Sequence, residues 1–341
     1  MNEVGFLDFY IAALITGSIL GMDRELLKKA AVRFLPVSFL SMAVAALMAG
    51  IVGILAGQGF WETVLYIAMP MMSGGMGAGV VPLSNIYADA LGLDKAQIIS
   101  RMIPASTIGN VLDYICRTRK ALGTMPEHPV AVTTIVSTDM ATPVAKKYGV
   151  ELRRTLTGFK FIGEQIGKLE KYGKADSYVF GFEESYGYLT GSYVRDKDGV
   201  DGAYMICEMF SYYATKGISL LDKLDELYKT YGYCLNTLHS YEFDGSAGFA
   251  KMQNIMQAFR GDIKEFGGKK VVKLLDYAPG LNGLPKSDVL KFLLEDNCSI
   301  VVRPSGTEPK LKTYISVSAE NKKAAEKVEA EICKSAEVYL K

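Results

Sequence analysis

Residues 303–309, RPSGTEP, combine a guanidinium, two hydroxyls and a glycine in one short stretch. The run CSIVV before it is apolar and the run KLKTYISVS after it alternates, which predicts a loop between two strands. Arg303 offers a planar fork of N–H donors, Ser305 and Thr307 add hydroxyls, and the Gly306 N–H is unobstructed. A set made only of donors suits a phosphate dianion. The residues alone leave open a surface turn with incidental polar side chains.

A second polar loop, GFEESYGY at residues 181–188, ends the apolar run SYVFGF. Glu183 and Glu184 can accept hydrogen bonds from sugar hydroxyls, Ser185 adds a hydroxyl of its own, and the flanking aromatic rings can pack on a sugar face. Open α/β sheets bind ligands at the carboxyl ends of their strands, which is where this loop is expected. The alternative is a solvated acidic turn.

The elements that position these loops follow from the apolar pattern. From residue 130, the runs VAVTTIVST, VELRRTL and SYVFGF alternate with helical stretches, which predicts a parallel α/β sheet. Asp198 or Asp201 is expected to cap the helix after RDKDGVDG. From residue 232, YCLNTLHSYEF, KVVKLLDY and CSIVV alternate as antiparallel strands do, and the last 20 residues are predicted to form an amphipathic helix.

The first third of the chain is of a different class. Only 13 of the 110 residues through Asn110 are charged, against 62 of the 231 that follow. Residues 34–61 carry no charge, and about 20 apolar residues suffice to cross a bilayer core. We therefore predict a membrane span there, weaker spans at 5–22 and 63–88, and a basic cytoplasmic loop at 23–33. The alternative is a large buried helix of a globular protein.

Glycine and proline interrupt the apolar run at residues 69–87, MPMMSGGMGAGVVPLSNIY. A nucleotide loop is not indicated, because no strand–loop–helix context surrounds the glycines and no GK[ST] follows them. In a membrane, interrupted helices expose backbone groups and mark substrate or ion sites, whereas small residues also serve close helix packing. Both interpretations stay open for the residues of this loop, Gly74, Gly75, Met76 and Gly77.

Bulk composition excludes some classes of partner. The formal net charge of +1 gives no electrostatic footprint for nucleic acid. The five cysteines form no CxxC pair and no metal spacing, so we expect reduced thiols and no metal site. We interpret His128 and His239 as structural.

The two polar loops, with GTMPEHPVAVTTIVSTDMA and LTGFKFIGEQI ahead of them, resemble the α-D-phosphohexomutases of the phosphoglucomutase and phosphomannomutase type. The resemblance implies an α/β third domain at 112–231 and an α+β C-terminal domain at 232–341. It implies a hexose phosphate, glucose or mannose 1- or 6-phosphate, whose hydroxyls Glu183 and Ser185 would grip. Lys160, in a Thr-Gly-x-Lys loop, would approach the reacting phosphate. The other phosphate would be held by Arg303, Ser305, Gly306 and Thr307.

SGGMGAG, followed by VPLSNIY, resembles the re-entrant loop of the 2-hydroxycarboxylate transporters, which are sodium- or proton-coupled carriers of citrate and malate. This resemblance covers about residues 1–111 and implies an α-helical transmembrane fragment. It also implies that Gly75, Met76 and Gly77 lie near substrate. The second, inverted repeat of that family, with its carboxylate-binding arginines, is not found in the sequence.

The sequence also lacks two loops that the mutase family uses for chemistry. There is no Ser-His-Asn-Pro-like phosphoserine loop and no Asp-Gly-Asp-x-Asp loop for the magnesium of the complete enzyme. Phosphoryl transfer without them loses its covalent step and its charge neutralisation. We therefore expect no catalytic residue here, and a truncated mutase, by family an isomerase, that binds hexose phosphate weakly without turnover. The alternatives are a citrate or malate transporter fragment, and a membrane-tethered sugar-phosphate-binding module completed by a separate N-terminal mutase half.

The two parts meet near residues 110–112 without a linker, which indicates a recombination product, an assembly artefact or a deliberate chimera. We expect residues 1–111 in the membrane and the mutase part in the cytoplasm, or a cytoplasmic chain if the first part does not insert.

Overall fold

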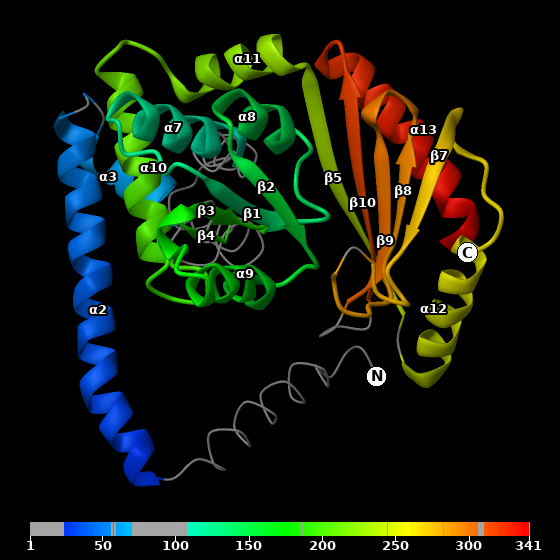
Figure 1. The fold of residues 1–341 in the computed structure, drawn as a ribbon, viewed down its shortest axis with the longest axis horizontal. Coiled ribbons are helices and arrows are strands. Elements are labelled where there is room, and N and C mark those ends of the chain that lie inside the picture. Colours follow the sequence, from blue (N-terminus) through cyan, green and yellow to red (C-terminus); the bar gives the residue numbers. More distant parts are fainter. Residues whose placement is uncertain are drawn as a thin grey trace.

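The computed structural model describes residues 24–55, 57, 59–69, 108–185, 187–243, 245–281, 283–305 and 310–340. Within these ranges two sheets lie side by side, each with its own helices, and one long helix lies at the outer side of the smaller sheet's helices (Figure 1). The predicted α/β part followed by an α+β part is confirmed.

The smaller sheet has the strand order β2-β1-β3-β4. Its strands are β1 (Val130–Thr134), β2 (Glu151–Thr155), β3 (Tyr178–Phe182) and β4 (Tyr188–Leu189). β1 pairs in parallel with β2 and β3, and β4 is antiparallel to β3. The helices around this sheet are α7 (Ile108–Ala121), α8 (Ala141–Tyr148), α9 (Phe159–Lys171), η5 (Ala175–Ser177), α10 (Gly199–Ala214) and α11 (Leu220–Tyr231).

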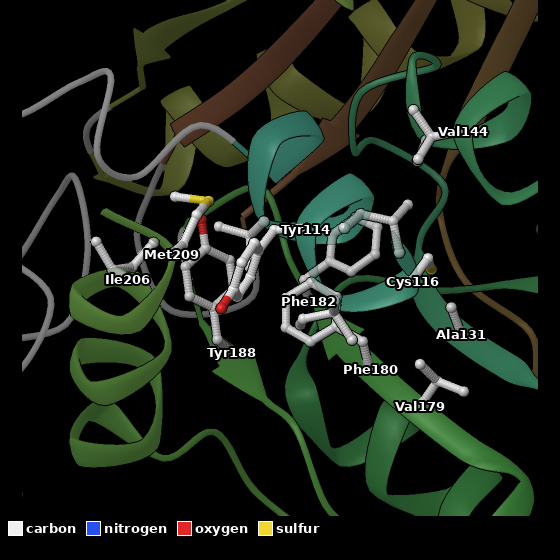
Figure 2. Packing of buried hydrophobic residues seen from close by; sticks show 14 of the residues in the cluster. Tyr114, Cys116, Ala131, Val144, Val179, Phe180, Phe182, Tyr188, Ile206 and Met209 are labelled. Carbon is white, nitrogen blue, oxygen red and sulfur yellow. The ribbon is translucent and has the colours of Figure 1, made fainter. Parts of the chain in front are cut away.

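Successive side chains of a strand point to opposite faces, and the buried run of β1 uses both. Val130 and Val132 pack on one face against Ile162 of α9. Ala131 packs on the other face, in a cluster with Phe180 and residues of α7, α8 and α10. Figure 2 shows the aromatic part of that cluster, in which the Phe180 ring stacks on Phe182 at 5.1 Å between centroids. Helices on both faces explain why the two central strands, β1 and β3, are buried along their whole length.

The acidic stretch at residues 196–202 serves the fold. Asp198 caps α10, since its Oδ1 accepts hydrogen bonds from the backbone N–H groups of Val200 and Asp201 at 2.9 and 3.1 Å. The Asp201 carboxylate accepts from the N–H and the hydroxyl of Thr190 at 2.7 and 2.5 Å. Of the two candidate caps, Asp198 is therefore the one used.

The larger sheet is antiparallel, with the strand order β5-β10-β9-β8-β7-β6. Ile300 and Val302 pack against the two helices on one face, whereas Val301 points to the other face and meets Tyr314. The elements are β5 (Tyr233–Glu242), α12 (Gly245–Phe259), β6 (Glu265–Phe266), β7 (Lys269–Asp276), β8 (Leu290–Leu294), η6 (Glu295–Asn297), β9 (Ser299–Pro304), β10 (Lys310–Ala319) and α13 (Lys322–Leu340).

The N-terminal part contains α2 (Arg24–Leu55), α3 (Phe60–Thr63) and the π-helix η2 (Val64–Ala68), and α2 packs against α10. The predicted loop at residues 23–33 is wrong for 24–33, because α2 is helical from Arg24 onward. Large apolar side chains of α2 are exposed, with Phe39 at 65% and Leu40 at 64%. In the part of the chain that the structure describes, no helix combines the length and apolar character needed for a membrane crossing. The predicted span at residues 34–61 is thus not confirmed, whereas the one at 5–22 and most of the one at 63–88 lie outside the described residues.

A buried ionic cluster ties α7 to its neighbours. Asp113 and Lys223 side chains are fully buried, and Lys223 Nζ lies 3.2 Å from Asp113 Oδ2. Asp113 also accepts hydrogen bonds from the Tyr148 hydroxyl at 2.8 Å and from Arg117 at 3.0 Å. One carboxylate on α7 therefore holds α8 and α11, which matters because α7 spans the predicted junction at 110–112.

We expect Asp113→Ala to lower the free energy of unfolding by about 3–5 kcal/mol, because it removes the buried counter-charge of Lys223. Chemical denaturation followed by circular dichroism measures this. The control is Glu151→Ala, which breaks the half-exposed pair with Arg153 and is expected to cost less than about 1 kcal/mol. Equal losses in the two variants would contradict the assignment.

Candidate functional site

The loop after β3 holds Glu183 in a fixed position. Glu183 is 4% exposed, and its Oε1 accepts hydrogen bonds from the Ser185 hydroxyl at 2.9 Å and from Lys197 Nζ at 2.8 Å. The Glu183 N–H donates to the Gly187 carbonyl at 3.0 Å and closes the loop. A Cβ at position 187 would lie 2.8 Å from Glu183 Oε1, so only glycine allows this closure without a shift. Glu183 and Ser185 are thus in direct contact, and their predicted role toward sugar hydroxyls stays a prediction.

Glu184 is anchored to the end of β1. Its Oε2 accepts a hydrogen bond from the Thr134 hydroxyl at 2.7 Å, and that hydroxyl lies 2.9 Å from Ser137 Oγ. Burial raises the pKa of Glu184, and the Thr134 hydrogen bond partly opposes the rise. Arg154 braces the same turn by donating to the Thr134 and Ser137 carbonyls at 3.3 Å. The carboxyl ends of β1, β2 and β3 therefore build one polar edge.

The RPSGTEP loop begins at the end of β9. Arg303 is half-buried and donates from NH1 to the Tyr314 hydroxyl at 3.3 Å. The Ser305 N–H donates to the Lys310 carbonyl at 2.7 Å, which closes the base of the loop. The predicted strand–loop–strand is confirmed at both ends. Gly306 and Thr307 lie outside the described residues, as do Gly74, Gly75, Met76 and Gly77.

The two loops converge at Tyr314 of β10. The pKa of Tyr314 is raised to about 12, chiefly by burial and then by the negative charge of Glu184, while the positive charge of Arg303 opposes the rise. The negative charge of Glu183 also raises the pKa of the Tyr314 hydroxyl. The carboxylates of Glu183 and Glu184 on one sheet are thus near enough to Tyr314 on the other to act on it electrostatically, and Arg303 contacts the same hydroxyl.

The contact between the two sheets fixes this geometry. Lys291 of β8 reaches out of its sheet and donates from Nζ to the Ile135 carbonyl at 2.9 Å. Burial of that side chain lowers the pKa of Lys291. Around it lies a cluster drawn from both sheets, namely Ile135, Val136, Leu156, Tyr277, Val289, Val301 and Tyr314.

The prediction that Lys160 lies on a loop is wrong. It lies in the first turn of α9, exposed to solvent, with Nζ 4.9 Å from the centroid of the Phe161 ring. The helix begins at Phe159 because Gly158 adopts a φ of 113° that lets the chain turn directly from the strand end into the helix.

Sequence reasoning missed three residues that shape the site. Lys197 pairs with Glu183, Thr134 holds Glu184, and Tyr314 contacts Arg303. Lys197 was hidden in an acidic turn and Thr134 in a buried strand. For Tyr314 the alternation of KLKTYISVS gave the only signal, since it indicates which residues share a face.

The described residues do not fit magnesium. Among them, the one group of three or more potential metal ligands is His239, Glu329 and Cys333, which lies on the α13 face of the larger sheet. Magnesium prefers oxygen ligands, whereas this group contains an imidazole and a thiol. What the two loops offer is the carboxylates of Glu183 and Glu184, which can accept hydrogen bonds, and the guanidinium donors of Arg303.

Three family models match the chain. The 2-hydroxycarboxylate transporter family matches residues 1–125. The α/β/α domain III of phosphoglucomutase/phosphomannomutase matches residues 108–231, and the C-terminal domain of the same family matches residues 249–335. The first two matches overlap in α7.

Individual proteins agree with this division. The citrate transporter CitP of Lactococcus lactis is 54% identical over 115 residues, which are 34% of this chain and 26% of CitP. A phosphoglucomutase of Staphylococcus aureus is 36% identical over 207 residues, which are 57% of this chain and 37% of that enzyme. The solved structure of pp63/parafusin from Paramecium, a phosphoglucomutase, is 20% identical, with a TM-score of 0.49, over 69% of this chain and 40% of its own.

This chain spans well under half the length of those relatives. It joins a fragment of the 2-hydroxycarboxylate transporter family, in its first third, to the third and C-terminal domains of the phosphoglucomutase/phosphomannomutase family.

Proposed function

We propose that the mutase part of this chain binds a hexose phosphate between its two sheets and does not convert it unaided. The observation that carries the proposal is the convergence of the Glu183–Ser185 pair and Arg303 around Tyr314. Carboxylate and hydroxyl groups suit the sugar, and a guanidinium suits the phosphate.

In this proposal each side chain has a separate task. Glu183 accepts hydrogen bonds from sugar hydroxyls, and Lys197 orients the carboxylate by its contact at 2.8 Å. Ser185 can turn its hydroxyl from Glu183 to the ligand. Arg303, with Ser305, Gly306 and Thr307, holds the phosphate that is not being transferred, so that either the 1- or the 6-phosphate can occupy the loop. Lys160 would approach the other phosphate from the start of α9.

Turnover needs groups that the proposal places outside this sequence. A phosphoserine donor and the magnesium of the complete relatives would come from a separate N-terminal mutase half. Magnesium supplies charge neutralisation in phosphoryl transfer, and the serine supplies the covalent step. The residues described here would bind and orient the sugar phosphate for that half.

For the N-terminal part we propose a membrane tether. The similarity of residues 1–125 to transporters and the exposed apolar side chains of α2 support it. Transport of citrate or malate is the second candidate, favoured by the 54% identity with CitP. Transport needs a complete pathway, and the matched segment is about a quarter of that carrier.

We expect Arg303→Ala to weaken the binding of glucose 1-phosphate and glucose 6-phosphate by roughly 10- to 100-fold, because it removes a charge-assisted hydrogen bond. Isothermal titration calorimetry measures the change. Arg153→Ala removes an equal charge from β2, away from both loops, and is the matched control. Unchanged binding in Arg303→Ala, with the fold intact by circular dichroism, would refute the site.

A coupled phosphoglucomutase assay tests the lack of turnover. The purified chain with magnesium is expected to show no turnover above background. Adding the first two domains of a phosphoglucomutase is expected to give a measurable rate of turnover. Glu183→Gln should abolish that gain. Turnover by the chain alone would show that it carries a nucleophile of its own.

Membrane fractionation separates the two candidates for the N-terminal part. We expect the full chain to sediment with membranes and resist alkaline extraction, because exposed apolar helices partition into lipid. Vesicles made from the same membranes should accumulate no more labelled citrate than vesicles without the chain. Uptake above that level would favour transport, and release by alkali would exclude the tether.

A further inference from the structure

The edge strand β5 faces α13 through alternate residues. Thr237, His239 and Tyr241 are half-buried, whereas the residues between them are exposed, so these three share the face toward the helix. On α13, Glu329 and Cys333 are one turn apart and therefore lie on one side of the helix. The two elements pack against each other.

Three side chains of different chemistry meet at this contact. His239 Nε2 lies 2.7 Å from Glu329 Oε1, and the Cys333 sulfur is close enough that all three ligand atoms lie within 4.8 Å of one another. The Thr237 hydroxyl donates to the same Glu329 oxygen at 2.6 Å. The carboxylate is therefore oriented from outside the trio, in the way that ligands of bound metals are.

We propose that His239, Glu329 and Cys333 form a binding site for a zinc-like divalent transition ion. Imidazole nitrogen, carboxylate oxygen and thiolate sulfur are the three ligand types of protein zinc sites. A tetrahedral ion at its usual bond lengths holds ligand atoms about 3.3–3.7 Å apart. To hold such an ion the 2.7 Å His239–Glu329 contact has to widen, and the Cys333 sulfur, now within 4.8 Å of both, has to lie in this range as well.

The site is open to an ion from solvent and leaves room for a fourth ligand. The His239 side chain is 33% exposed and that of Glu329 is 13% exposed. Water can therefore complete the tetrahedron. On binding, the Cys333 thiol gives its proton to solvent, so that one thiolate and one carboxylate balance the two charges of the ion.

Such an ion would clamp α13 onto the edge of the larger sheet. Among the strands that the structure describes, β5 pairs with β10 alone, and the metal would add a link from this edge strand to the helix. This role is independent of the sugar-phosphate site, which lies on the opposite face of the sheet.

Cobalt(II) substitutes for zinc and reports a bound thiolate by a charge-transfer band in the near ultraviolet. We expect one equivalent of cobalt to give this band with the full chain and zinc to displace it. Cys333→Ser should abolish the band, and His239→Ala should weaken zinc binding by at least roughly 100-fold. Cys234 is also a half-buried thiol, but it lies on β5 and outside the trio. Cys234→Ser should therefore leave the cobalt band and the zinc affinity unchanged.

The proposal is overturned if the full chain gives no thiolate band, or if the band survives Cys333→Ser. Glu329→Gln is a second probe that keeps the shape of the side chain. Zinc should raise the melting temperature of the chain and of Cys234→Ser, but not that of Glu329→Gln. An equal rise in all three would point to ions bound elsewhere.

Discussion

The Lys291 side chain crosses from β8 to the Ile135 carbonyl, at the turn where β1 ends, and the apolar cluster around it seals the two sheets together. Everything in the candidate site depends on this contact. The acceptors of the Glu183 loop belong to one sheet and Arg303 to the other, and neither set alone can hold both ends of a sugar phosphate. Burying an amine is costly unless it is hydrogen-bonded, so the bond to Ile135 fixes where the sheets meet.

Electrostatics within the site follows from that arrangement. Burial favours the neutral form of Glu184 and of Tyr314, while Arg303 favours the ionised carboxylate. The surroundings of Glu183 differ, because Lys197 contacts its carboxylate directly. Lys197 lies in a turn that the Asp198 cap holds in place. Two adjacent carboxylates thus have separate surroundings, one held by a cation and one by the Thr134 hydroxyl.

Much of the fold was predictable from local pattern, because buried strands and amphipathic helices have short-range signatures. β1, β3, α8 and α13 were placed within a few residues. The loop–strand boundaries followed for Arg303 and Glu183, and the resemblance to the mutases supplied their roles. Lys197 and Tyr314 were not predictable, since their contacts join segments 14 and 11 residues away through a tertiary arrangement. The contact of His239, Glu329 and Cys333 was still harder to predict. His239 and Glu329 are 90 residues apart in the sequence, and the three residues do not follow a known metal-ligand spacing.

The junction between the two families coincides with a helix that the mutase part needs. Inward residues of α7 are buried from Asn110 to Cys116, and the Asn110 amide donates to the Leu220 carbonyl at 3.2 Å. Together with the Asp113–Lys223 pair, these contacts close the layer over β3. Both family models extend into α7. The join therefore lies in a helix whose buried residues pack into the core of the third domain. A break a turn or more later would have removed Asp113 and left the buried Lys223 without its buried counter-charge, although Glu226, half-exposed, would still lie 2.7 Å away. The position of the join is therefore compatible with an intact third domain behind a foreign N-terminal segment.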